Sequence, residues 1–202
     1  MKKYDNTAGL ILAGGRAQRM GGQDKGLLQL NGHAMIEYVI AGLNRQVCAL
    51  TINANRNIHA YQQFGYPVIA DQLADFQGPL AGMVSAMQDC QHEYMVIAPC
   101  DGPFIRHDYV ARLHAARART GSNISVAHDG QRLQPVYTLL ASSLCPSLLA
   151  YLATGNRKID LWYQQEGYCV ADFADATELF VNINTPQELA TASKKIGPIN
   201  VD

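Results

Sequence analysis

The sequence of 202 residues is 48% hydrophobic and 16% charged, values that lie within ordinary globular composition and predict a substantial hydrophobic core. Lys+Arg 16 against Asp+Glu 17 gives a formal net charge of -1, which argues against a nucleic-acid-binding surface or an anionic-membrane patch. The five cysteines are scattered and contain no C-x-x-C pair, so neither a disulfide framework nor a zinc site is indicated. No apolar run approaches transmembrane length, and we expect a cytoplasmic protein.

Short apolar runs alternate with helical patterns through the first part of the chain, an order typical of βαβ units and a mostly parallel sheet. The predicted strands cover residues 10–12, 49–52, 68–70 and 95–98. The predicted helices cover residues 35–43, 58–64, 79–90 and 109–119. This alternation predicts an α/β protein.

The second part of the chain is less regular. We predict strands at residues 124–127 and 136–140, helices around Leu148 and Leu161, and a strand near Phe180. The run Asn184-Thr185-Pro186 then begins a final helix, because a cap residue is followed by Pro at an early helical position. No internal repeat or linker is present, so we expect one domain over residues 1–202.

Each predicted strand of the first part is followed by a glycine or a polar residue. Gly14, Asn53, Asp71 and Asp101 occupy these positions. Because ligands of open α/β sheets bind outside the carboxyl ends of the strands, we expect the four residues to share one rim. Asn53 and Asp71 have the position of a base or ribose contact, although Asp71 with Asp75 equally fits a capped turn.

The segment LILAGGRAQRMGGQDKGLL at residues 10–28 places five glycines and three cations behind the first strand. It fits neither a Walker loop nor the dinucleotide fingerprint G-x-G-x-x-G. The adjacent Gly14 and Gly15 let backbone N–H groups approach an anion closely, and Arg16, Arg19 and Lys25 add positive charge. The segment predicts a phosphate-binding loop of a third design; the alternative is a flexible turn with incidental cations.

Asp101 ends the apolar run of the fourth predicted strand, in the order Pro99-Cys100-Asp101. A carboxylate in this place can hold a Mg²⁺ ion together with phosphate oxygens, and a simple turn before Pro103 is the alternative. Cys100 is interpreted as a small core residue. No Ser-His-Asp or Cys-His arrangement is justified, and the six histidines show no metal-ligand spacing.

Six motifs together resemble the molybdenum cofactor guanylyltransferase family. They are L-A-G-G at 12–15, R-M-G-G at 19–22, D-K-G-L at 24–27, G-P-L-A-G at 78–82, P-C-D at 99–101 and N-I-N-T-P at 182–186. The resemblance implies a three-layer Rossmann-like nucleotidyltransferase fold with a mostly parallel, mixed central sheet. In that fold, about residues 1–120 would form the nucleotide-binding half and about residues 121–202 the acceptor-binding half.

The resemblance also implies a Mg²⁺-dependent reaction, in which GMP passes from GTP to the phosphate of molybdopterin and pyrophosphate is released. It implies catalytic roles for Arg19, Lys25 and Asp101, with Asp101 as the Mg²⁺ ligand. The implied GTP-binding residues are Leu12, Ala13, Gly14, Gly15, Gly22, Lys25, Asn53, Asp71 and Asp101. The nucleophile is a phosphate monoester with a second pKa of about 6, so no side chain needs to remove a proton.

The acceptor site is less defined by the motifs. Gly78 and Gly82 could open space for a pterin, or they could simply permit tight helix packing. Asn182 and Asn184 could meet the polar edge of the pterin, although Asn184 also fits a helix cap. Lys158, which follows Arg157, could contact the acceptor phosphate or belong to a solvated charge pair. Partners implied beyond the substrates are molybdenum-insertion proteins and apo-molybdoenzymes or their chaperones.

Two features depart from the family pattern. Gly102 stands where the family commonly has Thr, and Arg16-Ala17-Gln18 lacks a Ser that is common in related enzymes. The sequence is also compatible with a sister enzyme that uses CTP or loads a sugar phosphate, and with a nonenzymatic nucleotide-binding module on the same fold. Lys25 together with Asp101 argues against the binding module, because a binder has less need of a metal beside a leaving group.

Overall fold

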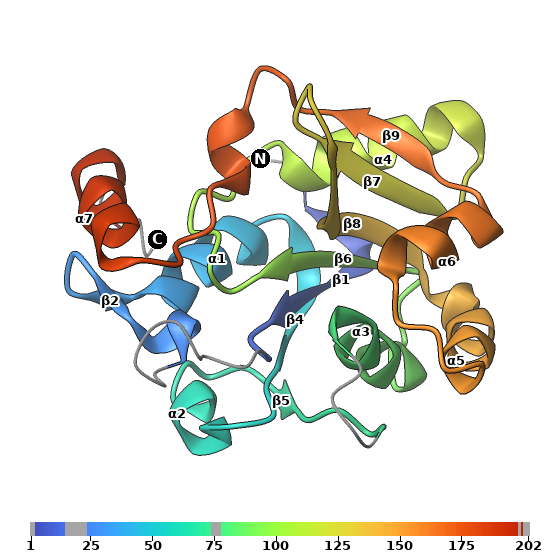
Figure 1. Ribbon diagram of the computed structural model, residues 1–202, viewed down its shortest axis with the longest axis horizontal. Helices are drawn as coiled ribbons and strands as arrows, with labels where there is room; N and C mark the ends of the chain where they lie inside the picture. The colour runs from blue at the N-terminus through green and yellow to red at the C-terminus, as the bar shows by residue number, and fades with distance from the viewer. Residues whose placement is uncertain (1–2, 15–23, 74–77, 198, 200–202) are drawn as a thin grey trace.

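The computed structural model describes residues 3–14, 24–73, 78–197 and 199, and within these ranges seven strands form the central mixed sheet (Figure 1). The strands are β1 (Tyr4–Leu12), β4 (Val47–Asn53), β5 (Val68–Ile69), β6 (Tyr94–Pro99), β7 (Ile124–His128), β8 (Leu133–Ala141) and β9 (Cys169–Asp172). Their order is β5-β4-β1-β6-β8-β7-β9. Strand β8 is antiparallel to both of its neighbours, and the other neighbouring pairs are parallel. The expected mostly parallel, mixed sheet is confirmed.

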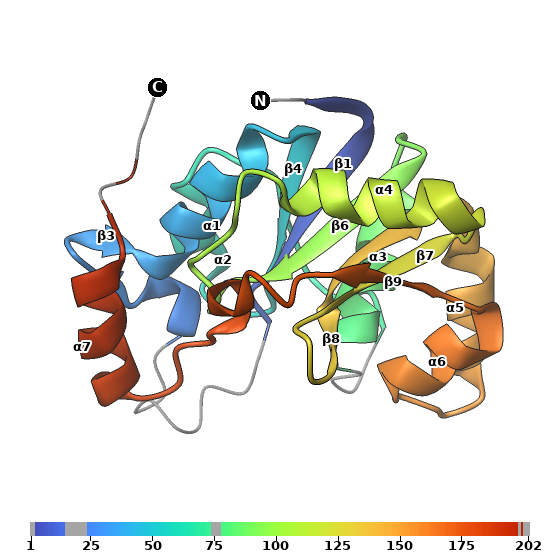
Figure 2. The same cartoon turned by 90° about the horizontal axis from the view of Figure 1, so that it is seen from above.

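Helices cover both faces of this sheet. They are α1 (Met35–Asn44), α2 (Ile58–Gln62), α3 (Pro79–Gln88), α4 (Tyr109–Thr120), α5 (Cys145–Ala153) and α6 (Ile159–Glu166), whereas α7 (Pro186–Lys195) packs in a separate apolar cluster. Alternate side chains of β1 enter different cores: Ile11 packs in the core with α1 and α4, whereas Leu10 and Leu12 pack with α3, α5 and α6. Figure 2 shows α4 and α6 on opposite sides of the strands. The three-layer α/β arrangement is therefore confirmed, and in the described ranges no helix is long and apolar enough to span a membrane.

A short hairpin follows the first loop and lies beside the last helix (Figures 1 and 2). Its strands, β2 (Gln29–Leu30) and β3 (His33–Ala34), are joined by Asn31 and Gly32, whose φ angles are 52 and 85. Two consecutive positive φ angles are the requirement of the tight turn that joins such strands, and Asn-Gly meets it at low cost. A small apolar cluster under the hairpin also includes Ile183 and Ala192, so it fixes the chain on both sides of the α7 start.

The strand predicted near Phe180 is wrong. Phe180 ends a short 3-10 helix, Thr177–Phe180, and the last strand of the sheet is β9, earlier in the chain. Strand β9 alternates buried Cys169 and Ala171 with exposed Val170 and Asp172, and it pairs in parallel with β7. The ring of Phe180 packs against Tyr137 and Phe173 from this 3-10 helix. An apolar residue can therefore reach the core here without belonging to a strand.

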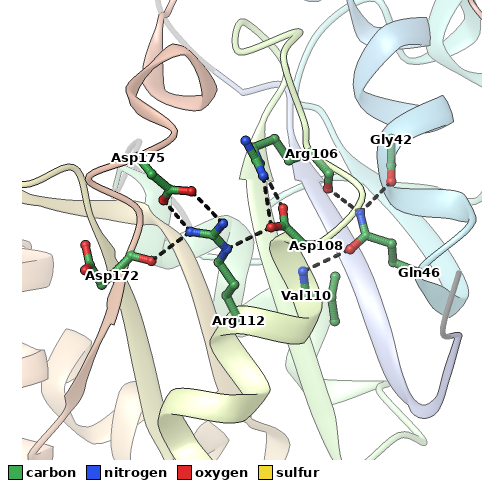
Figure 3. A network of polar contacts seen from close by, with 8 residues as sticks. All are labelled: Gly42, Gln46, Arg106, Asp108, Val110, Arg112, Asp172 and Asp175. Atoms are coloured by element: carbon green, nitrogen blue, oxygen red, sulfur yellow. Dashed lines mark hydrogen bonds and ion pairs between the residues drawn. The ribbon is translucent and has the colours of Figure 1, made fainter.

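Polar contacts connect the start of α4 to two other parts of the fold (Figure 3). Arg112 donates to both carboxylate oxygens of Asp175, at 2.5 and 2.8 Å, and to Asp108 at 2.8 Å. Arg106 donates to the same Asp108 at 2.9 and 3.1 Å. The buried Gln46, just beyond α1, accepts from the Val110 amide at 3.0 Å. These contacts fix α4 relative to α1 and to the segment that follows β9.

Candidate nucleotide and phosphate site

The ends of four parallel strands form one wall of a cavity of about 460 Å³. The amide of Ala13 donates to the Asn53 carbonyl at 2.8 Å, and the amide of Cys100 donates to the Leu12 carbonyl at 3.0 Å, so the strand pairing continues up to the cavity. The cavity is lined by Leu12, Ala13, Gly14, Asp24, Lys25, Asn53, Asn55, Asp71, Gly78, Pro79, Pro99, Cys100, Asp101 and Val136. The expectation that Gly14, Asn53, Asp71 and Asp101 share one rim is confirmed.

Two asparagines hold the Asp71 carboxylate on one side of this cavity. The Asn53 amide donates to Asp71 Oδ1 at 2.9 Å, and the Asn55 amide donates to Asp71 Oδ2 at 2.7 Å. Asn55 Oδ1 in turn accepts from the Asp71 backbone amide at 2.7 Å. Asn53 is only 3% exposed and also donates to the Ile69 carbonyl at 3.3 Å. Asn53 thus orients Asp71, and the Asp71 carboxylate presents its remaining lone pairs to the cavity.

Lys25 also lines this cavity and connects segments that are distant in sequence. Its ammonium donates to Asp101 Oδ2 at 3.0 Å and also to Asn184 Oδ1. The Lys25 and Asp101 side chains are 27% and 15% exposed. The amide of Ile183 donates to the Asp101 carbonyl at 2.9 Å, so the backbone beside Asn184 is fixed to the end of β6. A cation and a carboxylate therefore lie together on the wall of the cavity.

A second ion pair lies immediately before Lys25. The Asp24 side chain, 4% exposed, accepts from Arg56, and its other oxygen accepts from Asn57 at 2.9 Å. A charge-assisted bond to a buried carboxylate holds geometry strongly, because an unpaired charge there would be costly. The pair ties the end of the glycine-rich loop to the segment after β4.

Cys100 lies between the end of β6 and this loop. Burial raises the pKa of its thiol well above the ordinary value, so the sulfur stays protonated and unreactive at neutral pH. A side chain at Gly26 would come within 3.2 Å of the Cys100 sulfur and within 2.9 Å of the Tyr61 hydroxyl. Cys100 therefore acts as a small packing residue, as predicted.

The sequence matches the MobA-like NTP transferase domain family over residues 9–167. A molybdenum cofactor guanylyltransferase from Shewanella sp. (strain MR-4) is 50% identical over 179 residues, which cover 89% of this chain and 91% of that protein. The one from Shewanella frigidimarina (strain NCIMB 400) is 50% identical over 189 residues, with coverage of 92% and 96%.

This chain belongs to the molybdenum cofactor guanylyltransferase family. A solved structure of molybdopterin-guanine dinucleotide biosynthesis protein A from Archaeoglobus fulgidus shows the same fold, with a TM-score of 0.76 and 22% identity. The match covers 93% of this chain and 97% of that chain. As a member of a nucleotidyltransferase family, the protein is an enzyme, and the resemblance found from the motifs is confirmed.

Guanylyltransferase motif residues in the first loop fall partly outside the described residues. Gly15, Arg19 and Gly22, together with Arg16, are in that part of the chain, so their roles stay predictions. Gly14 and Lys25 flank the gap and both line the cavity. Asp24 belongs to the D-K-G-L motif but has no predicted role of its own, and no prediction includes Asn55 or Arg56. The only local signal for the last two is the polar run Asn55-Arg56-Asn57 directly after the β4 segment.

The residues predicted for the acceptor lie in different surroundings. Gly78, with a φ of 70, lines the cavity at the start of α3. Gly82 is buried one turn further on, and the space over its Cα is filled by the Asn53 side chain, so the packing explanation fits it. Asn182 and Asn184 do not line the cavity themselves, but Asn184 accepts from the lining residue Lys25 and the Ile183 amide between them donates to Asp101, while Thr185 is the cap of α7. Lys158 is exposed at the start of α6 and does not line this cavity.

The carboxylates at the cavity fit a divalent cation that arrives with a nucleotide. No group of three or more His, Cys, Asp or Glu in the described part of the chain could hold a metal by itself. Mg²⁺ in phosphoryl-transfer sites needs only one or two carboxylates, since phosphate oxygens and water supply the other ligands. Asp101, which faces the cavity and is partly exposed, meets that requirement.

Proposed function

We propose that this enzyme transfers GMP from GTP to the phosphate of molybdopterin, with Mg²⁺, and releases pyrophosphate. The observation that carries the proposal is the Lys25–Asp101 pair on the cavity wall, in a chain 50% identical to proteins named molybdenum cofactor guanylyltransferase. A cavity of about 460 Å³ also lies within the range of about 300–1,000 Å³ that is usual for small-molecule sites.

The nucleotide would lie along the strand ends. The backbone at Leu12, Ala13 and Gly14 would meet its phosphates, together with Gly15, Arg19 and Gly22 of the loop. Asp71, oriented by Asn53 and Asn55, would accept hydrogen bonds from the ribose or the base. This division leaves the Lys25 side of the cavity for the reacting phosphates.

The reaction would need positioning and charge neutralisation more than acid–base catalysis. The molybdopterin phosphate is largely dianionic at neutral pH, so it can attack the α-phosphorus of GTP without a general base. None of the described residues that line the cavity is a histidine, which agrees with this scheme. Lys25 and Arg19 would offset the charge of the two phosphates, and Asp101 would hold the Mg²⁺ that neutralises the departing pyrophosphate.

The acceptor would approach from the side of Asn182 and Asn184, with Gly78 at the cavity edge. Gly82 and Lys158 stay weaker acceptor candidates, since one is covered by Asn53 and the other lies outside this cavity. A cytoplasmic location, molybdenum-insertion proteins upstream and apo-molybdoenzymes or their chaperones downstream complete the proposal.

Calorimetric titration of the purified protein with GTP, CTP and ATP, each with and without Mg²⁺, tests the nucleotide. We expect GTP to bind most tightly and its affinity to rise with Mg²⁺. A pyrophosphate-release assay with GTP and molybdopterin then tests the transfer. Tighter CTP binding would instead assign a cytidylyltransferase, and binding without pyrophosphate release would leave only a nucleotide-binding module.

Asp101→Asn tests the metal-ligand role. The amide keeps the shape and can still accept from Lys25, but it removes the charge that a hard cation requires. We expect turnover to fall by about 100-fold or more, the order of magnitude for removing one electrostatic contact to a transition state. The matched control is Asp89→Asn, an exposed carboxylate beyond α3 and away from the cavity. A folded Asp101→Asn protein with normal turnover would remove Asp101 from the mechanism.

A further inference from the structure

Tyr137 reaches the rim of the site because β8 runs against the other strands. Strand β8 pairs with β6 in antiparallel register, with Thr138 opposite Ile97, so its first residues lie where β6 ends. Val136 lines the cavity, and the next residue, Tyr137, is fully buried. Its ring meets the rings of Tyr109 and Phe180 edge-on, with interplanar angles of 86° and 88°. The direction of the Tyr137 hydroxyl is therefore fixed by packing.

The hydroxyl of Tyr137 occupies the space that a side chain at position 102 would fill. It donates to Asn182 Oδ1 at 3.0 Å. A Cβ atom at Gly102 would overlap this hydroxyl and would lie 3.3 Å from the same Asn182 oxygen. Gly102 does not have a positive φ, so its backbone does not demand glycine. The structure needs glycine at position 102 only to make room for the Tyr137 hydroxyl.

The Asn182 amide belongs to the segment that carries Asn184 to Lys25. The Asn182 carbonyl accepts from the Asn184 side chain at 3.2 Å, and Asn184 Oδ1 accepts from the Lys25 ammonium. The amide of Ile183 donates to the Asp101 carbonyl at 2.9 Å. The Tyr137 hydroxyl on β8 thus orients Asn182 at one end of the Asn182–Asn184 segment, and Lys25, which is paired with Asp101, binds Asn184 at the other end.

We infer that Tyr137 is a positioning residue for the Asn182–Asn184 segment in acceptor binding. Gly102 belongs to the same arrangement, because its missing side chain leaves the space in which the Tyr137 hydroxyl reaches Asn182. The inference rests on the proposed function, because it assigns that segment to the pterin acceptor. Loss of the hydroxyl should weaken acceptor binding and leave GTP binding unchanged, because this hydroxyl bonds to Asn182 and to none of the residues proposed to bind GTP.

The test measures steady-state GMP transfer as a function of molybdopterin concentration, and GTP affinity by calorimetry. For Tyr137→Phe we expect the acceptor KM to rise about tenfold, as for the loss of one hydrogen bond, with the GTP Kd unchanged. Gly102→Ser alone should also raise the acceptor KM, since its side chain meets the Tyr137 hydroxyl. In the double variant Gly102→Ser/Tyr137→Phe, the serine hydroxyl replaces the missing one, and we expect the KM to return to within about threefold of the unaltered protein.

Gly102→Ala/Tyr137→Phe separates a hydroxyl effect from steric relief, because alanine fills the space without a donor. We expect it to keep the raised KM. The control for losing a buried tyrosine hydroxyl is Tyr163→Phe, whose partner is the Pro135 carbonyl at 2.8 Å, outside the Asn182–Asn184 segment. Melting temperatures report whether each variant is folded.

Four results would overturn the inference. A normal acceptor KM for folded Tyr137→Phe would remove the positioning role, and equal rescue by Ser and Ala would reduce the pair to packing. A parallel loss of GTP affinity would show a general structural effect instead. Absence of transfer by the unaltered protein would overturn the proposed function, and this inference with it. If the unaltered protein catalyses transfer and Tyr137→Phe has the same acceptor KM, only the inference is overturned.

Discussion

At the residue scale, Lys25 already has two acceptors inside the protein. Asp101, in the middle of the sequence, and Asn184, near its C-terminal end, both accept hydrogen bonds from its ammonium. Lysine is a compact charge on a flexible stem, so the ammonium can move toward phosphate oxygens without losing contact with the cavity. The bonds to Asp101 and Asn184 keep the ammonium oriented in the cavity. In the proposed function, phosphate oxygens of the nucleotide would replace one of these acceptors.

Gly82→Ala tests how the nucleotide wall is built. Alanine in a helix gains up to about 1 kcal/mol over glycine in intrinsic propensity. The added methyl would overlap Asn53 Oδ1 and lie 2.9 Å from Leu12 Cδ2. Overpacking of this kind costs about 1–3 kcal/mol, and we expect it to exceed the propensity gain and to displace Asn53 from Asp71.

Urea unfolding should therefore show a lower stability for Gly82→Ala, and calorimetry a weaker GTP affinity. Gly197→Ala is the control, because an added methyl at position 197 meets nothing within 4 Å. An unchanged GTP affinity would contradict the idea that Asn53 orients Asp71.

Site residues at strand ends could be predicted from the sequence pattern, whereas those on loops could be predicted only where a family motif includes them, as for Lys25 and Asn184. Asn53, Asp71 and Asp101 follow apolar runs, and parallel strands bring their carboxyl ends to one edge whatever the loops do. Asp24 and Arg56 come together across 32 positions of sequence, through a loop conformation that no local pattern specifies. Tyr137 is similar, because its position follows from the antiparallel direction of β8.

At the element scale, Gln46 supports the junction of α1 and α4. Its amide nitrogen donates to the carbonyls of Gly42 and Arg106 at 2.8 and 2.7 Å, and its oxygen accepts from the Val110 amide (Figure 3). We expect Gln46→Leu to lower the free energy of unfolding by about 2–3 kcal/mol, because it leaves buried backbone groups without a partner.

Denaturant titration measures this change, and the slope of the transition should stay the same. Gln63→Leu, on the exposed side of the segment after α2, is the matched control. Equal stability of the Gln46 and Gln63 variants would mean that water can replace the glutamine contacts.

The predicted elements are correct where apolar residues recur with the period of the element. They are wrong where the pairing with a neighbouring strand determines whether a strand forms. The helical patterns of α1, α3 and α4 are confirmed at their predicted places. Strand β9 has four residues and exists because β7 offers it an edge, so its short sequence carries little signal. The β2–β3 hairpin does have a local sequence signal, the Asn31-Gly32 pair of its turn, although the predicted elements do not include this hairpin.

At the scale of the whole molecule, the ion pairs around Asp108 at the start of α4 predict a dependence of stability on pH. Hydrogen bonds from Arg106 and Arg112 hold the pKa of Asp108 at about 2, below its usual value. A carboxyl with a lowered folded pKa stabilises the protein above its unfolded pKa of about 4, and this stabilisation is lost as pH falls toward 2.

Asp108→Asn should therefore be less stable than the unaltered protein at pH 7, by about 1–2 kcal/mol after allowance for solvent screening. The difference should shrink between pH 4 and pH 2, as measured by urea unfolding at several pH values. Asp160→Asn, exposed on α6, serves as control. A difference that does not change with pH would show that the charge of Asp108 contributes nothing.

The contact between Lys25 and Asn184 spans 159 positions of sequence, and it has a consequence for how the protein is made. Strands β1, β4, β5 and β6 precede residue 100, so a growing chain can pair them and bury much of the core early. Residues 182–184 are synthesised much later. A nascent chain can thus form the strand ends of the proposed nucleotide site before the proposed acceptor side exists, and by our proposal the two substrates can be brought together only after the ribosome has passed residue 184.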